Sequence, residues 1–269
     1  MKHLKFESTI LVAMSILLGS AGSKAVAGEP IRLRVLSYNI HHGEGVDRKI
    51  DLKRIADVVT SVKADIVAMQ EVDQNARRSG GVDQPAELAR LTKMNVAFGP
   101  NIDLQGGKYG NAVLSRFPIV RSKNHLLPSY DGGEQRGVFE AEIDLPDSGR
   151  NLILLATHLD ARRDHGERLE SAKVINEFAS NYPDRRLLLA GDLNATPSSG
   201  TLLRFFKTWT SANTKPLATI PVARPTKQID YVLYRPSDCW QVIEANVLPE
   251  AVASDHRAIL AVLQLQDRK

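Results

Sequence analysis

The sequence predicts an α/β sandwich folded as a single domain, and three observations support this. Short apolar segments typical of strands alternate with amphipathic segments typical of helices along the whole chain of 269 residues. Hydrophobic residues make up 43% of the chain, enough for a sizeable buried core, and no linker-like stretch divides it. Several apolar segments also end in polar residues, as strands do where a sheet presents a site.

The first 27 residues have the pattern of an export signal. Lys2 and Lys5 provide positive charge, residues 10–18 form an apolar run, and Ala25-Val26-Ala27 has the small-x-small pattern of a cleavage site. The apolar run is about half of the ~20 residues that span a bilayer. We therefore expect a cleaved signal rather than a membrane anchor. The mature domain would cover residues 28–269, in the periplasm or outside the cell, with no transmembrane segment.

The net charge makes nucleic acid a less expected partner, although it excludes no class of partner. The whole chain has a net charge of +4; removing Lys2, Lys5, Lys24 and Glu7 with the signal leaves about +2. A protein that depends on nonspecific duplex binding usually has a larger basic excess, so nucleic acid is an allowed partner but not a required one. Cys239 is the only cysteine and cannot form an intramolecular disulfide, so we expect it to be a small buried hydrophobe.

The first half of the chain begins with a strand. Residues 31–36 alternate in polarity and lead to Asn39. Apolar residues at helical spacing predict a helix over residues 52–62, with Asp51 as its N-cap. Residues 66–69 form a short apolar run consistent with a buried strand, and residues 85–91 predict a second helix.

The second half is richer in strands, which are separated by Gly, Pro and Asp turn residues. A helix is predicted over residues 167–179. Strands are predicted at residues 112–114, 119–127, 137–145, 152–157, 187–190, 229–234, 242–247 and 258–265.

Polar residues at the ends of these strands are the main functional signal. Each has an ordinary explanation on its own: Glu71 as a surface carboxylate, Asn39 as a turn residue, His158 as a core histidine and Asp192 as the start of an Asx-turn. Such explanations become improbable together when the residues follow strand after strand. We therefore expect the strand ends to form one site.

The motifs that contain these residues resemble those of the endonuclease/exonuclease/phosphatase superfamily. This metal-dependent group includes DNase I-like nucleases, abasic-site endonucleases, neutral sphingomyelinases and inositol polyphosphate 5-phosphatases. The matching segments span residues 37–257 in the family order: Ser37-Tyr38-Asn39-Ile40, Gln70-Glu71-Val72, Gly110-Asn111-Ala112-Val113-Leu114-Ser115-Arg116, Thr157-His158-Leu159, Gly191-Asp192-Leu193-Asn194, Gln228-Ile229-Asp230-Tyr231 and Ser254-Asp255-His256-Arg257. The resemblance implies a DNase I-like four-layer α/β sandwich, in which two packed mixed sheets are flanked by helices.

The resemblance also implies a divalent metal. A hard cation such as Mg²⁺ prefers oxygen ligands and neutralises charge on phosphoryl oxygens. Glu71 is the first candidate ligand, helped by Asn39 and Asp255. Mg²⁺ is the expected ion, and Mn²⁺ or Ca²⁺ are alternatives.

The same resemblance implies the catalytic roles. Asp192 would orient and deprotonate the attacking water, and Asn194 would hydrogen-bond that water or the phosphate. His256 would stabilise the phosphoryl oxygen, with Asp230 holding its imidazole. His158 would assist the leaving oxygen.

Three further residues are candidates for substrate binding. Tyr109 and Asn111 would line the phosphate pocket, and Arg136 would either clamp an anionic oxygen or form a structural ion pair. His41 and His42 follow Asn39 where abasic-site endonucleases place an acidic residue. With no cysteine or further histidine at short spacing, we expect a turn at the pocket mouth here rather than a zinc site.

The predicted activity is hydrolysis of a phosphate ester by an aspartate-activated water. A phosphodiester of modest size is favoured (nucleic acid, nucleotide or lipid headgroup), because His158 suits an alkoxide leaving group. A phosphomonoester is the alternative. A binding module without catalysis is the third hypothesis, which the retention of every matched catalytic residue disfavours. We expect a monomer.

Overall fold

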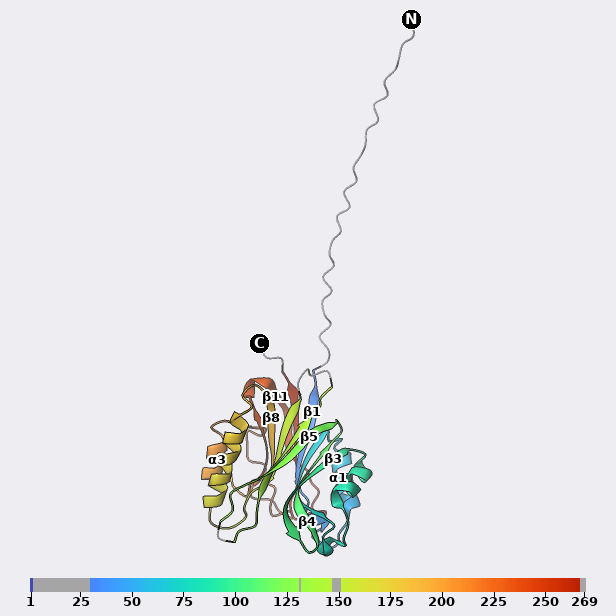
Figure 1. The fold of residues 1–269 in the computed structure, drawn as a ribbon, viewed down its shortest axis with the longest axis vertical. Helices are drawn as coiled ribbons and strands as arrows, with labels where there is room; N and C mark the ends of the chain where they lie inside the picture. Colours follow the sequence, from blue (N-terminus) through green and yellow to red (C-terminus); the bar gives the residue numbers. More distant parts are fainter. Residues whose placement is uncertain (2–29, 131, 147–150, 267–269) are drawn as a thin grey trace.

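Two six-stranded mixed sheets lie face to face in the computed structural model of the chain, which describes residue 1 and residues 30–130, 132–146 and 151–266 (Figure 1). The export signal predicted at residues 1–27 falls, apart from Met1, outside the described residues. The first sheet has the order β11-β12-β1-β2-β4-β3 and contains β1 (Arg32–Asn39), β2 (Ile66–Gln74), β3 (Asn95–Leu104), β4 (Gly107–Ser115), β11 (Trp240–Val247) and β12 (Ile259–Leu265). The second has the order β5-β6-β7-β8-β10-β9 and contains β5 (Ile119–Leu126), β6 (Gly137–Ile143), β7 (Leu152–His158), β8 (Arg186–Asp192), β9 (Thr210–Ser211) and β10 (Asp230–Arg235).

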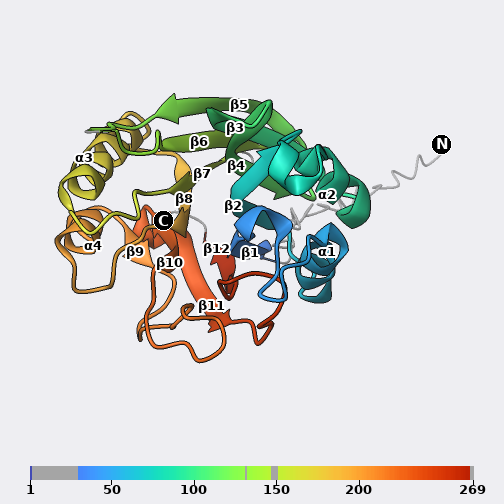
Figure 2. The same cartoon turned by 90° about the horizontal axis from the view of Figure 1, so that it is seen from below.

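Helices cover the outer face of each sheet, as Figure 2 shows. α1 (Leu52–Ser61) and α2 (Gln84–Thr92) pack on the first sheet, and α3 (Gly166–Ser180) and α4 (Gly200–Phe205) pack on the second. The other helices in the described part of the chain are the 3₁₀ helices η1 (His41–Gly43), η2 (Arg77–Ser79) and η3 (Ser237–Cys239). Asp51 caps α1 by accepting a hydrogen bond from the backbone N of Arg54 at 3.1 Å. The predicted four-layer α/β sandwich is confirmed.

The core alternates along each strand because both faces of each sheet are buried. On β1, Leu33 and Val35 pack between the sheets, whereas Leu36 and Tyr38 face the helices. Strand β8 shows the same pattern, with Leu188 and Ala190 inside and Leu187 and Leu189 facing α3 and α4. Strands buried on both faces read as continuous apolar runs, which explains why the sequence located most of them.

The elements that the sequence missed are short or lie at a sheet edge. β3 is the edge strand of the first sheet and contains Gly99 and Pro100, which an edge tolerates because one side needs no ladder hydrogen bonds. α4 has six residues and β9 has two, too few to show a period. Cys239 is buried, as predicted. Among the described residues, no helix has the length and hydropathy that a membrane span requires.

The directions of the strands bring six chain segments to one edge of the sandwich. β1 runs parallel to β2, and β7 runs parallel to β8, so these four strands end at the same edge. β10 is antiparallel to β8, and β12 is antiparallel to β1, so these two strands begin there. Residues far apart in the sequence therefore meet at this edge.

Candidate active site

Three neighbouring strands of the second sheet place a row of polar side chains at this edge. His158 ends β7, Asp192 ends β8 and Asp230 begins β10, and the register pairs Asp192 with both of the others. Gly191 is required beside this row, because a Cβ at that position would lie 1.9 Å from the backbone oxygen of Thr157. The row is thus fixed by backbone pairing rather than by loops.

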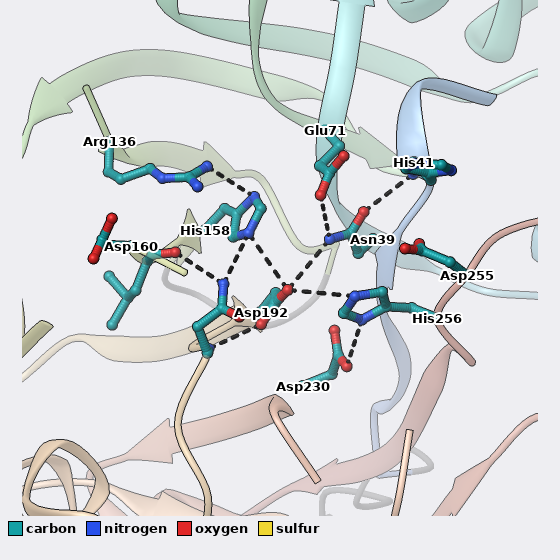
Figure 3. Close-up of polar contacts among 12 residues, drawn as sticks. Asn39, His41, Glu71, Arg136, His158, Asp160, Asp192, Asp230, Asp255 and His256 are labelled. Carbon is teal, nitrogen blue, oxygen red and sulfur yellow. Dashed lines mark hydrogen bonds and ion pairs between the residues drawn. The ribbon is translucent and has the colours of Figure 1, made fainter. Parts of the chain in front are cut away.

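The first sheet supplies Asn39 at the end of β1 and Glu71 from a bulge within β2. The register of β2 shifts between Met69 and Val72, and Glu71 has a left-handed φ of 58° in this bulge. A bulge redirects a side chain, and here it aims the Glu71 carboxylate at Asn39. The Asn39 Nδ2 donates to Glu71 Oε1 at 3.0 Å and to Asp192 Oδ2 at 3.2 Å, so it joins the two sheets (Figure 3).

His256 enters from the loop before β12. Ser254 Oγ donates to the backbone oxygen of Asn39 at 2.7 Å and fixes this loop to the end of β1. The Nδ1 of His256 donates to Asp230 Oδ2 at 3.0 Å, and its Nε2 lies 3.7 Å from Asp192 Oδ2. The imidazole therefore lies between two carboxylates.

This arrangement shifts the pKa values of both partners. Burial and the neighbouring Asp230 raise the pKa of Asp192 to about 7; the residue is 1% exposed. Burial opposes a charge on His256, but the carboxylates of Asp230 and Asp192 outweigh it and raise the pKa of His256 to about 10. At neutral pH, His256 is a cation beside a carboxyl group poised to exchange a proton.

His158 is held as a neutral imidazole. Arg136 Nη1 lies 3.2 Å from His158 Nδ1, and because a guanidinium can only donate, Nδ1 accepts and Nε2 carries the hydrogen. That Nε2 lies 3.4 Å from Asp192 Oδ2. Burial, Arg136 and His256 hold the pKa of His158 well below its ordinary value. His158 therefore serves the site as a hydrogen-bond donor, not as a cation.

Asn194 completes the surroundings of Asp192. Its backbone N donates to Asp192 Oδ1 at 2.9 Å. Its amide nitrogen donates to the backbone oxygen of Leu159 at 3.0 Å. The same nitrogen lies 3.0 Å from His158 Nε2, which with Nε2 protonated is a contact between two donors and not a hydrogen bond. Asn194 has a left-handed φ of 45°, a conformation that asparagine tolerates better than most residues.

A pocket of about 310 Å³ opens over this network. Its lining includes seven of the residues predicted for the site: Glu71, Tyr109, Arg136, His158, Asp192, Asn194 and His256. Asn39 and Asp230 are buried behind it and hold Glu71, Asp192 and His256 in place.

The other two predicted site residues, like Asn39 and Asp230, are not part of the pocket lining. Asn111 is buried, donates from Nδ2 to the backbone oxygen of Gly137 at 3.2 Å, and is not among the lining residues in the described part of the chain. Asp255 is exposed and lies beside Asn39 in Figure 3. Arg136 lines the pocket and forms an ion pair with Glu134, at 2.6 Å.

Other pocket residues were missed by the sequence reasoning. Arg78 lies in η2 and forms an ion pair with Asp73, with its guanidinium carbon 5.1 Å from the ring centroid of Tyr109. Ile102 and Leu104 of β3 form an apolar part of the wall. Their local sequence gives no signal of a site, because only the packing of β3 and η2 beside β4 brings them there.

The oxygen donors present fit a hard dication. Glu71 offers a carboxylate, and Asn39 Oδ1 accepts a hydrogen bond from the backbone N of His41 at 3.1 Å, which leaves a second lone pair. Among the described residues, two compact groups of ligand atoms occur, His41–His42–Glu71 and Asp192–Asp230–His256, and Asp255 belongs to neither.

Comparisons with known proteins agree with this geometry. The chain matches the Endonuclease/Exonuclease/phosphatase family over residues 36–256 and belongs to that family. It is therefore a hydrolase of phosphate ester bonds in a generally metal-dependent family.

Its similarity to particular members extends over most of the chain. It is 29% identical over 246 residues to the uncharacterized protein YbhP of Escherichia coli strain K12, covering 86% of this chain and 96% of YbhP. The structure of an endonuclease/exonuclease/phosphatase from Beutenbergia cavernae has a TM-score of 0.73 at 26% identity, with 87% and 72% of the two chains covered. The 5'-tyrosyl-DNA phosphodiesterase of Caenorhabditis elegans is 24% identical over 195 residues, covering 70% of this chain and 50% of that protein.

Proposed function

We propose that this protein is an exported, Mg²⁺-dependent phosphodiesterase that acts on a diester of modest size through a water activated by Asp192. The observation that carries the proposal is the position of the Asp192 carboxylate. It contacts Asn39, which also holds Glu71, and lies within 3.7 Å of both His158 and His256. The Asp192 carboxylate thus lies close to both histidines and, through Asn39, is linked to the candidate metal ligand Glu71.

Asp192 is suited to accept the proton of the attacking water. A general base works best when its pKa lies near the working pH, and the pKa of Asp192 is raised to about 7. Its Oδ1 is fixed by the backbone N of Asn194, and Asp192 lines the pocket. A dication held by Glu71, Asn39 and Asp255 would neutralise negative charge on the phosphoryl oxygens.

His256 stabilises the charge that grows on a phosphoryl oxygen. A fixed cation at the wall of a pocket acts strongly there because it needs no reorganisation during the reaction. Asp230 holds the ring through Nδ1, and the hydroxyl of Thr219 donates to the same Asp230 oxygen. The ring therefore presents Nε2 to the pocket.

His158 and Arg136 serve the other side of the substrate. The neutral His158 donates a hydrogen bond from Nε2 to the leaving oxygen, and Arg136 fixes its tautomer. Arg136 and Arg78 supply positive charge to the pocket wall, which Glu134 and Glu71 partly balance. This near-neutral balance suits a diester, which carries one negative charge, better than a monoester dianion.

The size of the pocket supports a small substrate. A volume of about 310 Å³ is at the lower end of the range for small-molecule sites and suits a nucleotide or a headgroup. Together with the near-neutral charge of residues 28–269, this volume favours a nucleotide or headgroup over a nucleic-acid duplex bound along an extended surface.

The test is a hydrolysis panel on residues 28–269 with Mg²⁺ or with EDTA. The substrates are bis-p-nitrophenyl phosphate, p-nitrophenyl phosphate, plasmid DNA and a choline phospholipid. EDTA-sensitive cleavage of a diester supports the proposal, and cleavage of the monoester alone would replace it with a phosphomonoesterase. Export is tested by expressing the full chain: recovery of a product starting near residue 28 outside the cytoplasm supports it, and a cytoplasmic uncleaved product refutes it.

A further inference from the structure

Two histidines outside the catalytic network form a compact group with Glu71. His41 and His42 occupy η1, directly after β1, and their ring centroids are 4.5 Å apart. One ligand atom each from His41, His42 and Glu71 lies within 4.8 Å of the other two. Figure 3 shows His41 beyond Asn39 and Glu71, on the side away from His158 and Arg136.

Glu44 orients both rings so that each keeps a free lone pair. The His41 Nδ1 lies 3.0 Å from the backbone oxygen of Glu44, and because a carbonyl only accepts, Nδ1 donates, so the Nε2 of the neutral tautomer has the lone pair that a metal needs. The His42 Nε2 lies 3.5 Å from the Glu44 carboxylate. The His42 Nδ1 is buried and has no hydrogen-bond partner among the described residues. Metal-binding histidines are oriented in this way by a carbonyl or carboxylate on the opposite ring nitrogen.

The backbone of all three residues is held in the left-handed region. The φ angles are 46° for His41, 43° for His42 and 58° for Glu71. Such angles cost roughly 1–2 kcal/mol for each non-glycine residue and persist where the surroundings impose them, often at functional sites. Here the buried side chain of Gln84 donates to the backbone oxygen of His42 at 2.7 Å and locks the turn.

We propose that His41, His42 and Glu71 form a second metal site that binds a transition-metal dication such as Zn²⁺ or Mn²⁺. Two imidazoles and one carboxylate favour these ions over Mg²⁺, which prefers an all-oxygen shell. Ligands about 2.0–2.2 Å from an ion lie about 3–4 Å apart, so the three groups close by about 1 Å on binding. Three protein ligands leave a position open for water or a phosphate oxygen.

This site shares Glu71 with the pocket, so a bound ion would lie beside the substrate phosphate. That consequence rests on the proposed function, whereas the binding of the ion does not. The spacing of the histidines along the chain gave no reason to expect the site, because the third ligand comes from β2. The other compact group is less suited to a metal, because its His256 already uses Nδ1 to hold Asp230.

The test is direct binding of Co²⁺ to untagged, metal-free protein, followed by its visible d–d absorption. We expect one equivalent with a spectrum characteristic of nitrogen ligation, counted apart from any Co²⁺ at the oxygen ligands of the first site, and Zn²⁺ to displace it. His41→Asn and His42→Asn should each weaken binding by at least about 10-fold, a loss that even an outer partner of a metal-bound histidine can cause. Asparagine tolerates the left-handed backbone, so these variants remove the ring without adding strain.

Two control variants locate the site. His165→Asn changes an exposed histidine and should leave Co²⁺ binding unchanged. His256→Asn should also leave it unchanged, and loss of the spectrum in this variant would place the ion in the catalytic network and overturn the inference. An unchanged affinity in both His41→Asn and His42→Asn would overturn it as well.

The outcomes separate this inference from the proposed function. Co²⁺ binding that depends on His41 and His42, without any phosphoesterase activity, would support the metal site and refute the activity. Mg²⁺-dependent hydrolysis without histidine-dependent Co²⁺ binding would support the activity and refute the site.

Discussion

Replacing Asp192 with asparagine should slow the enzyme and stabilise the protein at the same time. The carboxylate is buried beside Asp230, and this environment disfavours its negative charge. An asparagine has nearly the same shape but carries no charge and cannot accept the proton of the attacking water. The two effects therefore have opposite signs and can be measured separately.

The size of the stability change follows from the two pKa values. Asp192 has an ordinary pKa of 3.8 and a folded-state pKa of about 7. Each pKa unit corresponds to about 1.4 kcal/mol, so the charged form costs the folded state roughly 4 kcal/mol above pH 7. Asparagine removes this cost but weakens the hydrogen bonds from Asn39 and Asn194, each worth about 1 kcal/mol. The net expectation is a gain of about 2 kcal/mol.

The sign of the pH dependence is also fixed. A carboxyl group whose folded-state pKa is raised lets the folded state bind more protons, so the wild type loses stability as the pH rises from 3.8 to about 7. The advantage of Asp192→Asn should therefore be smallest near pH 4, increase up to pH 7 and remain constant above it.

Urea denaturation in EDTA at several pH values measures the stability, and turnover of bis-p-nitrophenyl phosphate with Mg²⁺ measures the activity. We expect kcat to fall by about 10²- to 10⁴-fold, the usual contribution of a general base. The exposed Asp57→Asn on α1 is the matched control and should change neither quantity. A near-normal rate would refute Asp192 as the base, and a variant less stable than the wild type at pH 8 would refute the electrostatic reasoning.

Three further variants test the rest of the site. Asp230→Asn should lower kcat by about 10²- to 10⁴-fold with little change in KM, because His256 loses the carboxylate that holds it as a cation. Gly191→Ala should destabilise the fold by about 3 kcal/mol in urea denaturation, since its Cβ would meet the backbone oxygen of Thr157. His158→Gln should change how stability depends on pH: the pKa of buried His158 lies well below 6.5, so below pH 6.5 the unfolded wild type gains a proton that the folded state excludes. The wild type should then lose up to about 1.4 kcal/mol per pH unit relative to the variant.

Each of these three predictions would be contradicted by a particular result. A normal kcat in Asp230→Asn would show that His256 needs no carboxylate partner. Gly200→Ala has room for its Cβ, with the nearest atom 3.4 Å away, and equal losses in the two glycine variants would refute the close-approach argument. Parallel pH–stability curves for the wild type and His158→Gln in EDTA would show that His158 is not held neutral.

The sequence alone was sufficient for the architecture and for most of the residues that the structure brings together at the candidate site. Strands buried on both faces appear as apolar runs, and His158 and Asp192, which follow such runs, stand at the strand ends in the structure. Glu71 was also expected at a strand end, but it lies in a bulge within β2, which continues to Gln74. The family motifs made the four-layer fold predictable because they occur in a fixed order over residues 37–257. Elements without a period, such as β3 and α4, could not be found in this way.

Only the tertiary structure decided how these residues act on one another. Register pairs His158, Asp192 and Asp230 across three strands, and this proximity produces pKa shifts that no local sequence encodes. The sequence likewise could not place Arg78 in the pocket or Asn111 outside its lining, because both positions depend on packing between segments distant in the chain. The residue types that can perform the chemistry are therefore a local property of the sequence. Their distances, burial and charge states arise only when the two sheets bring the strand ends together.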